Sequence, residues 1–220
     1  MNQGPLTIVG IFGGTFDPIH YGHLRSALEL TESLALAQLR FMPCAQPPHR
    51  EATACSAEQR AAMVELALAG EPRLVCDTRE LARSGPSYTI DSLAELRREL
   101  GADTSLCLIM GCDALLKIDS WHRWDALLDL AHVVVIARPG WQLPTTGPVA
   151  QWLQQHRCEG VACLSRRPAG SVIIEELRAL AISSTEIRQL LAAGHSARYL
   201  MPEPILDYID NHHLYGVSPG

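Results

Sequence analysis

Lysine is nearly absent from this chain: Lys117 is the one lysine among 18 basic residues, which face 24 acidic ones. The formal charge of −6 argues against a broad basic surface, and so against binding to nucleic acid polymers. A local basic pocket remains compatible with this balance. The preference for arginine suits phosphate or carboxylate ligands, but a biased genome composition produces the same preference.

Paired cysteines and long apolar runs are lacking as well. The 7 cysteines are an odd number without any C-x-x-C pair, which disfavours a disulfide framework or a zinc knuckle. We therefore expect mostly small buried thiols in a reducing compartment. A signal or transit peptide would require positive charges near its start, but no arginine or lysine precedes Arg25. The apolar run around residues 133–137 is too short to cross a membrane. These absences predict a soluble, cytoplasmic protein without contact to a membrane.

What is present is enough to build a globular core. The chain has 220 residues, of which 47% are hydrophobic and 19% charged, and this balance excludes intrinsic disorder. No internal repeat or low-complexity tract interrupts it. We expect one domain that covers residues 1–220.

Short apolar runs alternate with helical patterns along the chain. Strands are expected at residues 6–12, 39–43, 73–77, 104–110 and 132–137 and, from weaker patterns, at 161–164 and 171–174. Helices are expected at residues 22–37, 90–100, 184–193 and 203–211, and between the cap residue Ser56 and Gly70. This alternation predicts an α/β fold with a doubly wound, mostly parallel sheet and C-terminal helices.

Polar or glycine-rich segments follow four of the expected strands. They comprise residues 13–23, 47–50, 85–89 and 111–113. In an open parallel sheet, ligands bind beyond the carboxyl ends of the strands. We therefore expect all four segments on one rim of the sheet, where a site would lie.

The segment after the first strand, GGTFDPIHYGH, combines two glycines with two histidines. It matches neither the dinucleotide motif G-x-G-x-x-G nor the P-loop motif. Gly13 and Gly14 permit close approach of the backbone to a ligand. His20 and His23 share one face at a helix N-terminus, which is a favourable place for phosphate. Two alternatives stay open: one histidine caps the helix while the other is exposed, or the pair binds zinc, although no third ligand has a suggestive spacing.

A second group, ISSTEIR at residues 182–188, places three hydroxyl groups at the start of an expected helix. Ser183 and Glu186 form a capping-box pattern, and Arg188 lies about one turn further along. Such groups would form the other half of a phosphate site. The alternative is a well-capped helix with a surface arginine.

Together, the two segments resemble the nucleotidyltransferase superfamily with H-x-G-H and I-S-S-T-x-x-R signatures. Further segments, at residues 47–50, 87–91, 111–113 with Trp121, and 137–140, resemble the bacterial nicotinate-mononucleotide adenylyltransferases. The likeness runs from about residue 7 to residue 215. It implies a Rossmann-like nucleotidyltransferase fold and an enzyme of NAD biosynthesis, which transfers the adenylyl group of ATP to nicotinate mononucleotide and forms deamido-NAD and pyrophosphate.

The implied chemistry agrees with the residue types. The acceptor phosphate is already ionised at neutral pH, so positioning and charge stabilisation are required but a general base is not. The resemblance makes His20, His23 and Arg188 catalytic, with Mg²⁺ held mainly by ATP phosphates and water and without a dedicated protein ligand. The implied ATP site consists of Gly13, Gly14, Thr15, Phe16, His20, His23, Gly111, Asp113, Ile182, Ser183, Ser184, Thr185 and Arg188.

The resemblance also implies a site for nicotinate mononucleotide. It places Trp121 against the pyridine ring, which suits an indole face, and Thr89 at the carboxylate. Arg50 stands where many relatives have lysine, and His122 where an aromatic residue is frequent. The implied acceptor residues are Thr15, His49, Arg50, Tyr88, Thr89, Trp121 and His122.

Alternatives remain for single residues and for the whole protein. Trp121 and Trp124 could belong to the core or to an oligomer contact, Asp113 could be a plain N-cap, and Asp17 is interpreted as a structural tie of its loop. Other candidate functions are a sister transferase for nicotinamide mononucleotide or phosphopantetheine, a nucleotide sensor without turnover, and a metalloprotein built on the histidine pair. A homo-oligomer stays open as an alternative to a monomer.

Overall fold

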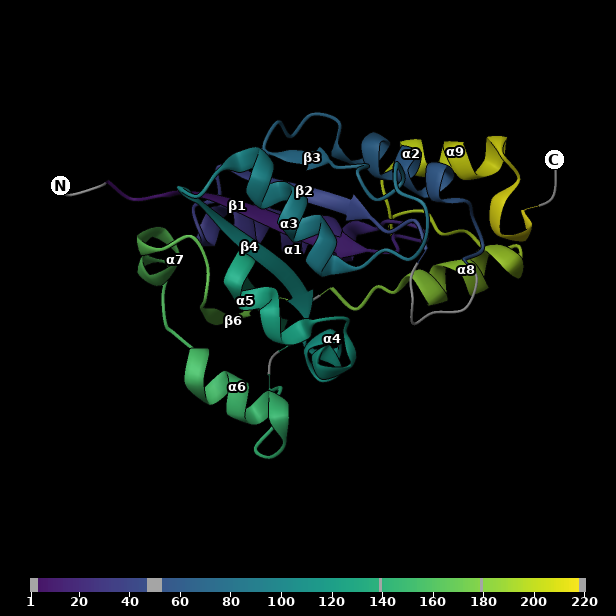
Figure 1. Ribbon diagram of the computed structural model, residues 1–220. Coiled ribbons are helices and arrows are strands. Elements are labelled where there is room, and N and C mark those ends of the chain that lie inside the picture. Colours follow the sequence, from purple (N-terminus) through teal and green to yellow (C-terminus); the bar gives the residue numbers. More distant parts are fainter. Residues whose placement is uncertain (1–3, 47–52, 139, 179, 218–220) are drawn as a thin grey trace. The chain divides into compact units, whose positions relative to one another are not determined.

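The computed structural model describes residues 4–46, 53–138, 140–178 and 180–217 (Figure 1). As far as they are described, these residues form two compact units. The first unit comprises Met1–Gly13, Glu29–Arg40 and Tyr88–Arg178, and the second comprises Gly14–Leu28, Phe41–Ser87 and Ala179–Gly220. Each unit is therefore assembled from three separate stretches of the chain.

The strands form one sheet in the order β3-β2-β1-β4-β5-β6. Their bounds are β1 (Thr7–Gly14), β2 (Gln38–Pro43), β3 (Leu74–Cys76), β4 (Thr104–Gly111), β5 (His132–Ala137) and β6 (Val172–Glu176). The pairs β1–β4, β4–β5 and β5–β6 are parallel, with Gly10 opposite Cys107 and Val133 opposite Val172. β2 passes from the first unit into the second, which holds β3. The predicted α/β class with a mostly parallel, doubly wound sheet is confirmed.

Continuous apolar runs explain the burial of the strands in the first unit. Residues 105–110 of β4 and 132–135 of β5 are all buried. Strands with helices on both faces show such runs, because neither face of the sheet meets water. Gly10 of β1 has no space for a side chain, since a Cβ there would lie 2.8 Å from Cδ1 of Leu36.

Two helices of the first unit cover its strands. α3 (Thr89–Leu100) and α5 (Leu127–Leu130) pack on one another, on β4 and on β5 (Figure 1). α3 ends at Gly101, as expected, where φ is +81°. The other helical elements described in this unit are α4 (Cys112–Leu115), η1 (Ile118–Ser120), η2 (Trp124–Ala126), α6 (Pro148–His156) and α7 (Ala162–Arg166).

The second unit contains α2 (Ala57–Leu68), α8 (Ser184–Ala192), α9 (Glu203–Asn211) and the 3₁₀ turn η3 (Leu214–Gly216). α2 begins with the predicted capping box, in which Ser56 and Gln59 each accept a backbone N–H of the other. α9 packs on α2, and η3 packs on α8. α1 (Tyr21–Ser33) begins in this unit and continues into the first.

Two local predictions are wrong. The helix expected at residues 22–37 ends at Ser33, because Ala35 adopts a positive φ of 50° and the N–H of Leu36 bonds to the carbonyl of Thr31. Residues 161–164, expected as a strand, belong to the turn and helix around α7. A short apolar run has too little periodicity to distinguish a strand from a helix.

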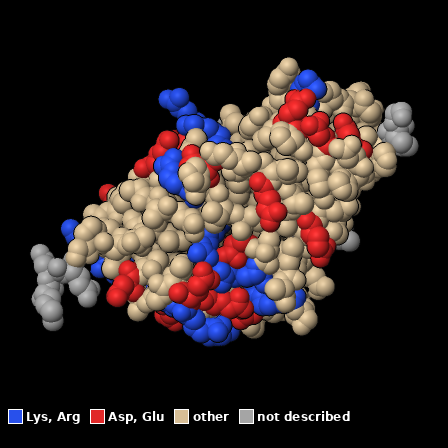
Figure 2. Space-filling model, turned by 90° about the horizontal axis from the view of Figure 1, so that it is seen from above, with Lys and Arg blue, Asp and Glu red and all other residues tan. Residues whose placement is uncertain are grey.

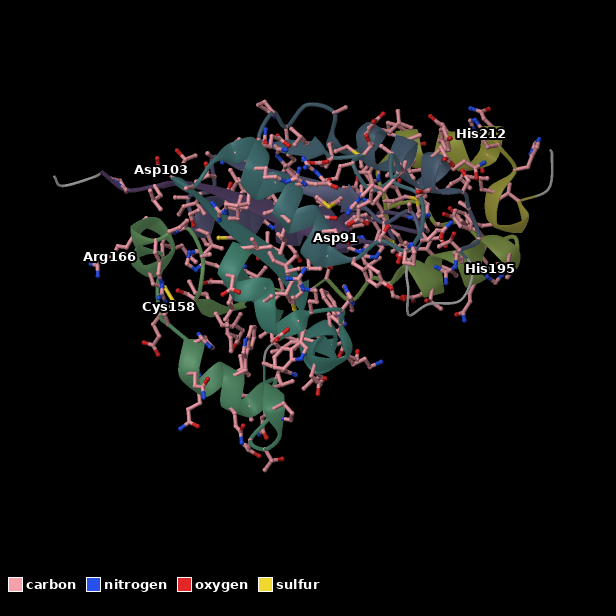
Figure 3. All side chains as sticks on the ribbon, viewed as in Figure 1. Asp91, Asp103, Cys158, Arg166, His195 and His212 are labelled. Atoms are coloured by element: carbon pink, nitrogen blue, oxygen red, sulfur yellow. A yellow bond between two sulfur atoms is a disulfide. The ribbon has the colours of Figure 1, made fainter. Side chains whose placement is uncertain are left out.

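The expectation of small buried thiols is wrong for two cysteines. Cys158 and Cys163 form a disulfide in the first unit, with their Cα atoms 6.7 Å apart (Figure 3). The chain turns back between them at Gly160, whose φ is 74°. Three other thiols are buried as expected, those of Cys55, Cys107 and Cys112, whereas Cys44 and Cys76 are half-buried.

The surface agrees with the charge balance of the sequence. On the face seen in Figure 2, basic and acidic side chains occur in small interspersed groups. Within the described ranges, no helix has the length and apolar character that a membrane span requires.

Candidate functional site

The loop between β1 and α1 lies in the second unit and has an unusual backbone. Asp17 precedes a cis proline, and Phe16 has a positive φ of 49° although it is not a glycine. The Phe16 ring folds back over Gly14, where a Cβ would lie 2.8 Å from the ring. Around Gly13, by contrast, a Cβ would meet no described atom within 4 Å. Gly14 is therefore required by its own loop, whereas Gly13 leaves open space of the kind that a ligand could use.

The two histidines of the H-x-G-H segment stack on one another. The ring centroids of His20 and His23 are 3.8 Å apart, and the ring planes are inclined by 27°. Nδ1 of His20 accepts the N–H of Gly22 at 3.1 Å, so a neutral His20 carries its proton on Nε2. A Cβ on Gly22 would lie 2.9 Å from the His20 ring. Because Gly22 has no side chain, the His20 ring can pack against the start of α1.

Burial determines the charge of this pair. It lowers the pKa of His20 to about 4. It also lowers the pKa of His23 to about 3, with a smaller effect from the neighbouring His20. Phe16 adds to the apolar surroundings, since its ring meets His23 edge-on at a centroid distance of 5.2 Å. Both imidazoles are neutral at pH 7 and can offer a ligand N–H groups without a full positive charge.

The N-terminus of α8 contacts the same loop, within the second unit. Ser184 donates its hydroxyl hydrogen to the carbonyl of Pro18 at 2.9 Å. Nη1 of Arg188 donates to the carbonyl of Asp17 at 2.7 Å, and Nη2 reaches Oγ1 of Thr185 at 3.4 Å. The structure thus brings the two signature segments together.

The start of α8 retains groups for an anion. Ser183 is the N-cap, and its side chain accepts the N–H of Glu186 at 3.2 Å. Ser183 and Thr185 are exposed, and Ile182 is half-buried, with its carbonyl 3.4 Å from where a Cβ of Gly22 would stand. A helix N-terminus supplies further N–H groups and a partial positive charge. With the neutral histidines and Arg188, this set of donors suits a polyphosphate.

Asp17 ties down its loop, as expected from the sequence. Its Oδ2 accepts the N–H of Ala54 at 3.1 Å, and its Oδ1 accepts the hydroxyl of Tyr215 at 2.7 Å. Both carboxylate oxygens are thus engaged with the protein.

Sequence reasoning missed Arg60, a fully buried residue of α2. Its guanidinium donates to the carbonyl of Thr15 at 2.6 Å and to that of Cys44 at 2.7 Å. A signal was present in the sequence, because helical spacing places Arg60 on the same face as Val64 and Leu68, which are both buried.

Most of the residues expected at the acceptor lie in the first unit. The rings of Tyr88 and His122 are in contact, with centroids 4.5 Å apart. Tyr88 is the N-cap of α3, and Thr89 is the first residue of that helix. Trp121 is half-buried and directly follows η1, with its N–H bonded to the carbonyl of Ile118. Tyr88, Thr89 and the 121–122 segment therefore belong to one unit.

Three further residues of the first unit bear on the alternatives. Trp124 packs against Trp152 with centroids 5.9 Å apart, so it belongs to an aromatic contact. Gly111 is the N-cap of α4, which means that the N-cap interpretation of Asp113 is wrong. Asp113 lies exposed in the first turn of this helix.

Two residues expected at the acceptor, His49 and Arg50, lie outside the described residues.

Metal binding by protein side chains alone has little support within the described ranges. They contain no group of three or more His, Cys, Asp or Glu side chains that could hold a metal ion. The hydroxyl, imidazole and guanidinium groups of the loop and of α8 are suited to phosphate oxygens. This donor set fits a metal ion that arrives on a nucleotide.

Comparison with known proteins identifies the family. The cytidylyltransferase-like family profile matches residues 11–190. A probable nicotinate-nucleotide adenylyltransferase of Cellvibrio japonicus is 52% identical over 208 residues, which cover 94% of this chain and 98% of that protein. The chain belongs to the nicotinate-nucleotide adenylyltransferase family. Another member, from Aeromonas salmonicida, is 51% identical and covers 94% of this chain and 96% of its own.

Solved structures confirm the fold of this adenylyltransferase family member. The nicotinic acid mononucleotide adenylyltransferase of Plasmodium falciparum, complexed with NaAD, aligns with a TM-score of 0.73. It covers 97% of this chain and 100% of its own at 17% sequence identity. The same Plasmodium protein complexed with APC aligns with a TM-score of 0.69. The Rossmann-like nucleotidyltransferase fold implied by the two signatures is therefore correct.

Proposed function

We propose that this enzyme transfers the adenylyl group of ATP to the phosphate of nicotinate mononucleotide, with release of pyrophosphate. The observation that carries this proposal is the stacked pair His20 and His23 on a loop that Arg188 and Ser184 of α8 hold. Relatives about half identical to the chain are named for this activity.

The reaction requires little acid–base chemistry from the protein. An oxygen of the acceptor phosphate attacks the α-phosphorus of ATP, and the bond to the bridging oxygen of the β-phosphate breaks. The nucleophile is already anionic, so no side chain has to remove a proton. The protein has to hold the two phosphates in line and stabilise the charge that grows on the leaving pyrophosphate.

The residues of the second unit are suited to that task. Nε2–H of the neutral His20 is one donor, since its Nδ1 is occupied by Gly22. We assign His23, the more strongly buried partner, to the oxygens of the reacting phosphate. Arg188, Thr185 and the N-terminus of α8 would hold the triphosphate. Donors fixed in surroundings of low polarity stabilise such charge more strongly than water does.

We propose a divalent ion, Mg²⁺, as the metal of the reaction. Bound to the phosphate oxygens of ATP, Mg²⁺ would neutralise part of their charge. In the part of the chain that the structure describes, both carboxylate oxygens of Asp17 in this loop accept hydrogen bonds within the protein. The ATP phosphates and water would therefore supply most of the metal coordination.

For the acceptor, we propose the residues that the family resemblance implies. Trp121 would face the pyridine ring, with Tyr88, Thr89 and His122 around the nicotinate group. His49 and Arg50 would hold the acceptor phosphate, and Thr15 would also contact the acceptor. Gly111 and Asp113 would contact the ATP ribose. Since the family match runs through both units, we also propose that residues 1–220 form a single domain.

The test is pyrophosphate release from ATP and Mg²⁺ with one of three acceptors: nicotinate mononucleotide, nicotinamide mononucleotide or phosphopantetheine. We expect strong release with the nicotinate compound and little with the others, because a hydrogen-bonded carboxylate contact discriminates by a few kcal/mol. A His20→Gln/His23→Gln double variant, purified in the same way, measures release by contaminating enzymes. Preference for another acceptor would contradict the proposal, and so would release that the double variant retains.

A further inference from the structure

Arg60 joins two segments of the second unit, the one that follows β1 and the one that follows β2. It extends from α2 and is 0% exposed. Nη1 donates to the carbonyl of Thr15, just after β1, and Nη2 donates to the carbonyl of Cys44, just after β2. A longer bond of 3.4 Å reaches the carbonyl of Ala45. One side chain thus holds both segments at the rim where the ligand is expected.

The cost of burying this side chain suggests that it has a use beyond stability. The hydrogen-bond partners of its guanidinium are neutral carbonyl groups, and Nε is buried without a hydrogen-bond partner within the described ranges. Removing a guanidinium charge from water is expensive unless a carboxylate compensates it. The neighbouring positions on the buried face of α2, such as Met63 and Val64, are filled by apolar residues that avoid this cost.

Arg60 acts on the strained part of the β1–α1 loop. The carbonyl of Thr15 and the N–H of Phe16 belong to one planar peptide group and point in opposite directions. Fixing that carbonyl therefore fixes the direction of the Phe16 N–H. It also supports Phe16 in its positive φ of 49°, a conformation that costs about 1–3 kcal/mol in a residue other than glycine. The Phe16 ring in turn contacts His23 edge-on.

We infer that Arg60 is a positioning residue for adenylyl transfer, which holds the Thr15–Phe16 peptide and, through the Phe16 ring, His23 in the arrangement that the reaction needs. This inference rests on the proposed function. It predicts an effect on turnover rather than on substrate affinity alone, because a donor displaced by about 1 Å loses much of its effect on the transition state.

The experiment compares Arg60→Met with a matched control, Arg97→Met. Arg97 makes the same kind of contact in the first unit, where its guanidinium donates to the carbonyls of Gly101, Thr104, Leu130 and Pro168. These contacts lie at the amino end of β4, away from the rim of the loops. Both variants lose an arginine bound to backbone carbonyls, and only one of them loses the bond to the Thr15 carbonyl.

The readouts are Tm, kcat and KM for pyrophosphate release, at a temperature where each variant is folded. Both variants should have a lower Tm. We expect kcat to fall about tenfold or more in Arg60→Met with KM for ATP changed less than threefold, and kcat to remain normal in Arg97→Met. Arg60→Lys, which can reach one carbonyl, should restore part of kcat.

Other results would overturn the inference. The inference is wrong if kcat of Arg60→Met stays within threefold of the wild-type value. It is also wrong if Arg97→Met loses as much kcat as Arg60→Met, because both losses would then follow from lower stability. If Arg60→Met does not fold, Arg60→Lys takes its place, and a kcat of Arg60→Lys within threefold of the wild-type value overturns the inference. A wild-type enzyme that releases no pyrophosphate with any acceptor would refute the proposed function, an outcome distinct from an active wild type whose Arg60 variants are equally active.

Discussion

The hydroxyl of Tyr215 donates to Oδ1 of Asp17 at 2.7 Å, across 198 positions of the sequence. The other carboxylate oxygen accepts the N–H of Ala54, and the Asp17 carbonyl accepts Nη1 of Arg188. Three segments distant in the sequence therefore converge on one residue of the β1–α1 loop. The end of the chain contributes directly to the order of the candidate site.

We predict that Tyr215→Phe destabilises the protein by about 1–2 kcal/mol, because it leaves Oδ1 of Asp17 without its buried donor. Burial raises the pKa of Tyr215, so the phenol is a hydrogen donor throughout the usual pH range. Urea unfolding of the variant and the wild type measures the difference. Tyr208→Phe in α9 is the control for the loss of a tyrosine hydroxyl, and an equal effect of the two changes would contradict the prediction.

His23→Ala should lower kcat by about a hundredfold or more, since one donor aimed at growing charge contributes that much. KM for ATP should change less. The matched control is His212→Ala, which removes an exposed histidine stacked on Tyr208 with centroids 4.0 Å apart. Steady-state kinetics of both variants checks the prediction, and near-normal turnover of His23→Ala would refute the role of His23.

Arg188→Ala should weaken ATP binding, because it removes a positive charge and the bond to the Asp17 carbonyl at 2.7 Å. A charge-assisted contact of this kind is worth about 1.5–3 kcal/mol, or roughly ten- to a hundredfold in Kd. Titration calorimetry with ATP and Mg²⁺, without acceptor, measures the change. If the variant binds ATP normally and only KM for the acceptor rises, the assignment of Arg188 to the triphosphate is wrong.

Trp121→Ala should raise KM for nicotinate mononucleotide more than KM for ATP, because the indole is assigned to the pyridine ring. Trp124→Ala is the control. Trp124 packs on Trp152, so its loss should lower Tm and leave the two KM values in their normal ratio. Equal rises of both KM values in Trp121→Ala would count against stacking.

Stability should fall as the pH drops below about 6.5. The pKa values of His20 and His23 in the folded protein, about 4 and 3, lie below the ordinary value of 6.5. Burial also lowers the pKa of His132, whose Nδ1 accepts the N–H of Ser171. The unfolded chain therefore takes up protons from pH 6.5 downward, whereas the folded protein does not until lower pH. Above pH 6.5 these histidines are neutral in both the folded and the unfolded state, so they do not make the free energy of unfolding depend on pH.

The measurement is the free energy of unfolding in urea at pH 7.5, 6.5, 5.8 and 5.2. Each histidine contributes at most about 1.4 kcal/mol per pH unit to the slope below pH 6.5. His23→Gln should show a shallower slope than the wild type. A flat profile between pH 6.5 and 5.2 would show that these histidines are not held neutral.

Some elements could be predicted because their signals are local. Ser56 and Gln59 lie three positions apart and cap α2, and Gly101 ends α3 with a positive φ, as glycine does readily. α6 was not predicted, although Gly147 and Pro148 mark its start. Of the capping box expected at Ser183 and Glu186, the bond from the Glu186 N–H to the Ser183 side chain is present.

Local pattern was sufficient for the six strands of the sheet and for the two signature segments, since each depends on residues a few positions apart, but it also predicted a strand at residues 161–164 where α7 lies. The contacts between those segments and distant residues could be seen only in the folded chain. Arg188 reaches Asp17 across 171 positions, and Arg60 reaches Thr15 across 45. The low pKa values of the histidines arise from desolvation, which exists only once other elements cover the rings. Residue spacing predicts the donors of this site, and packing determines their direction and charge.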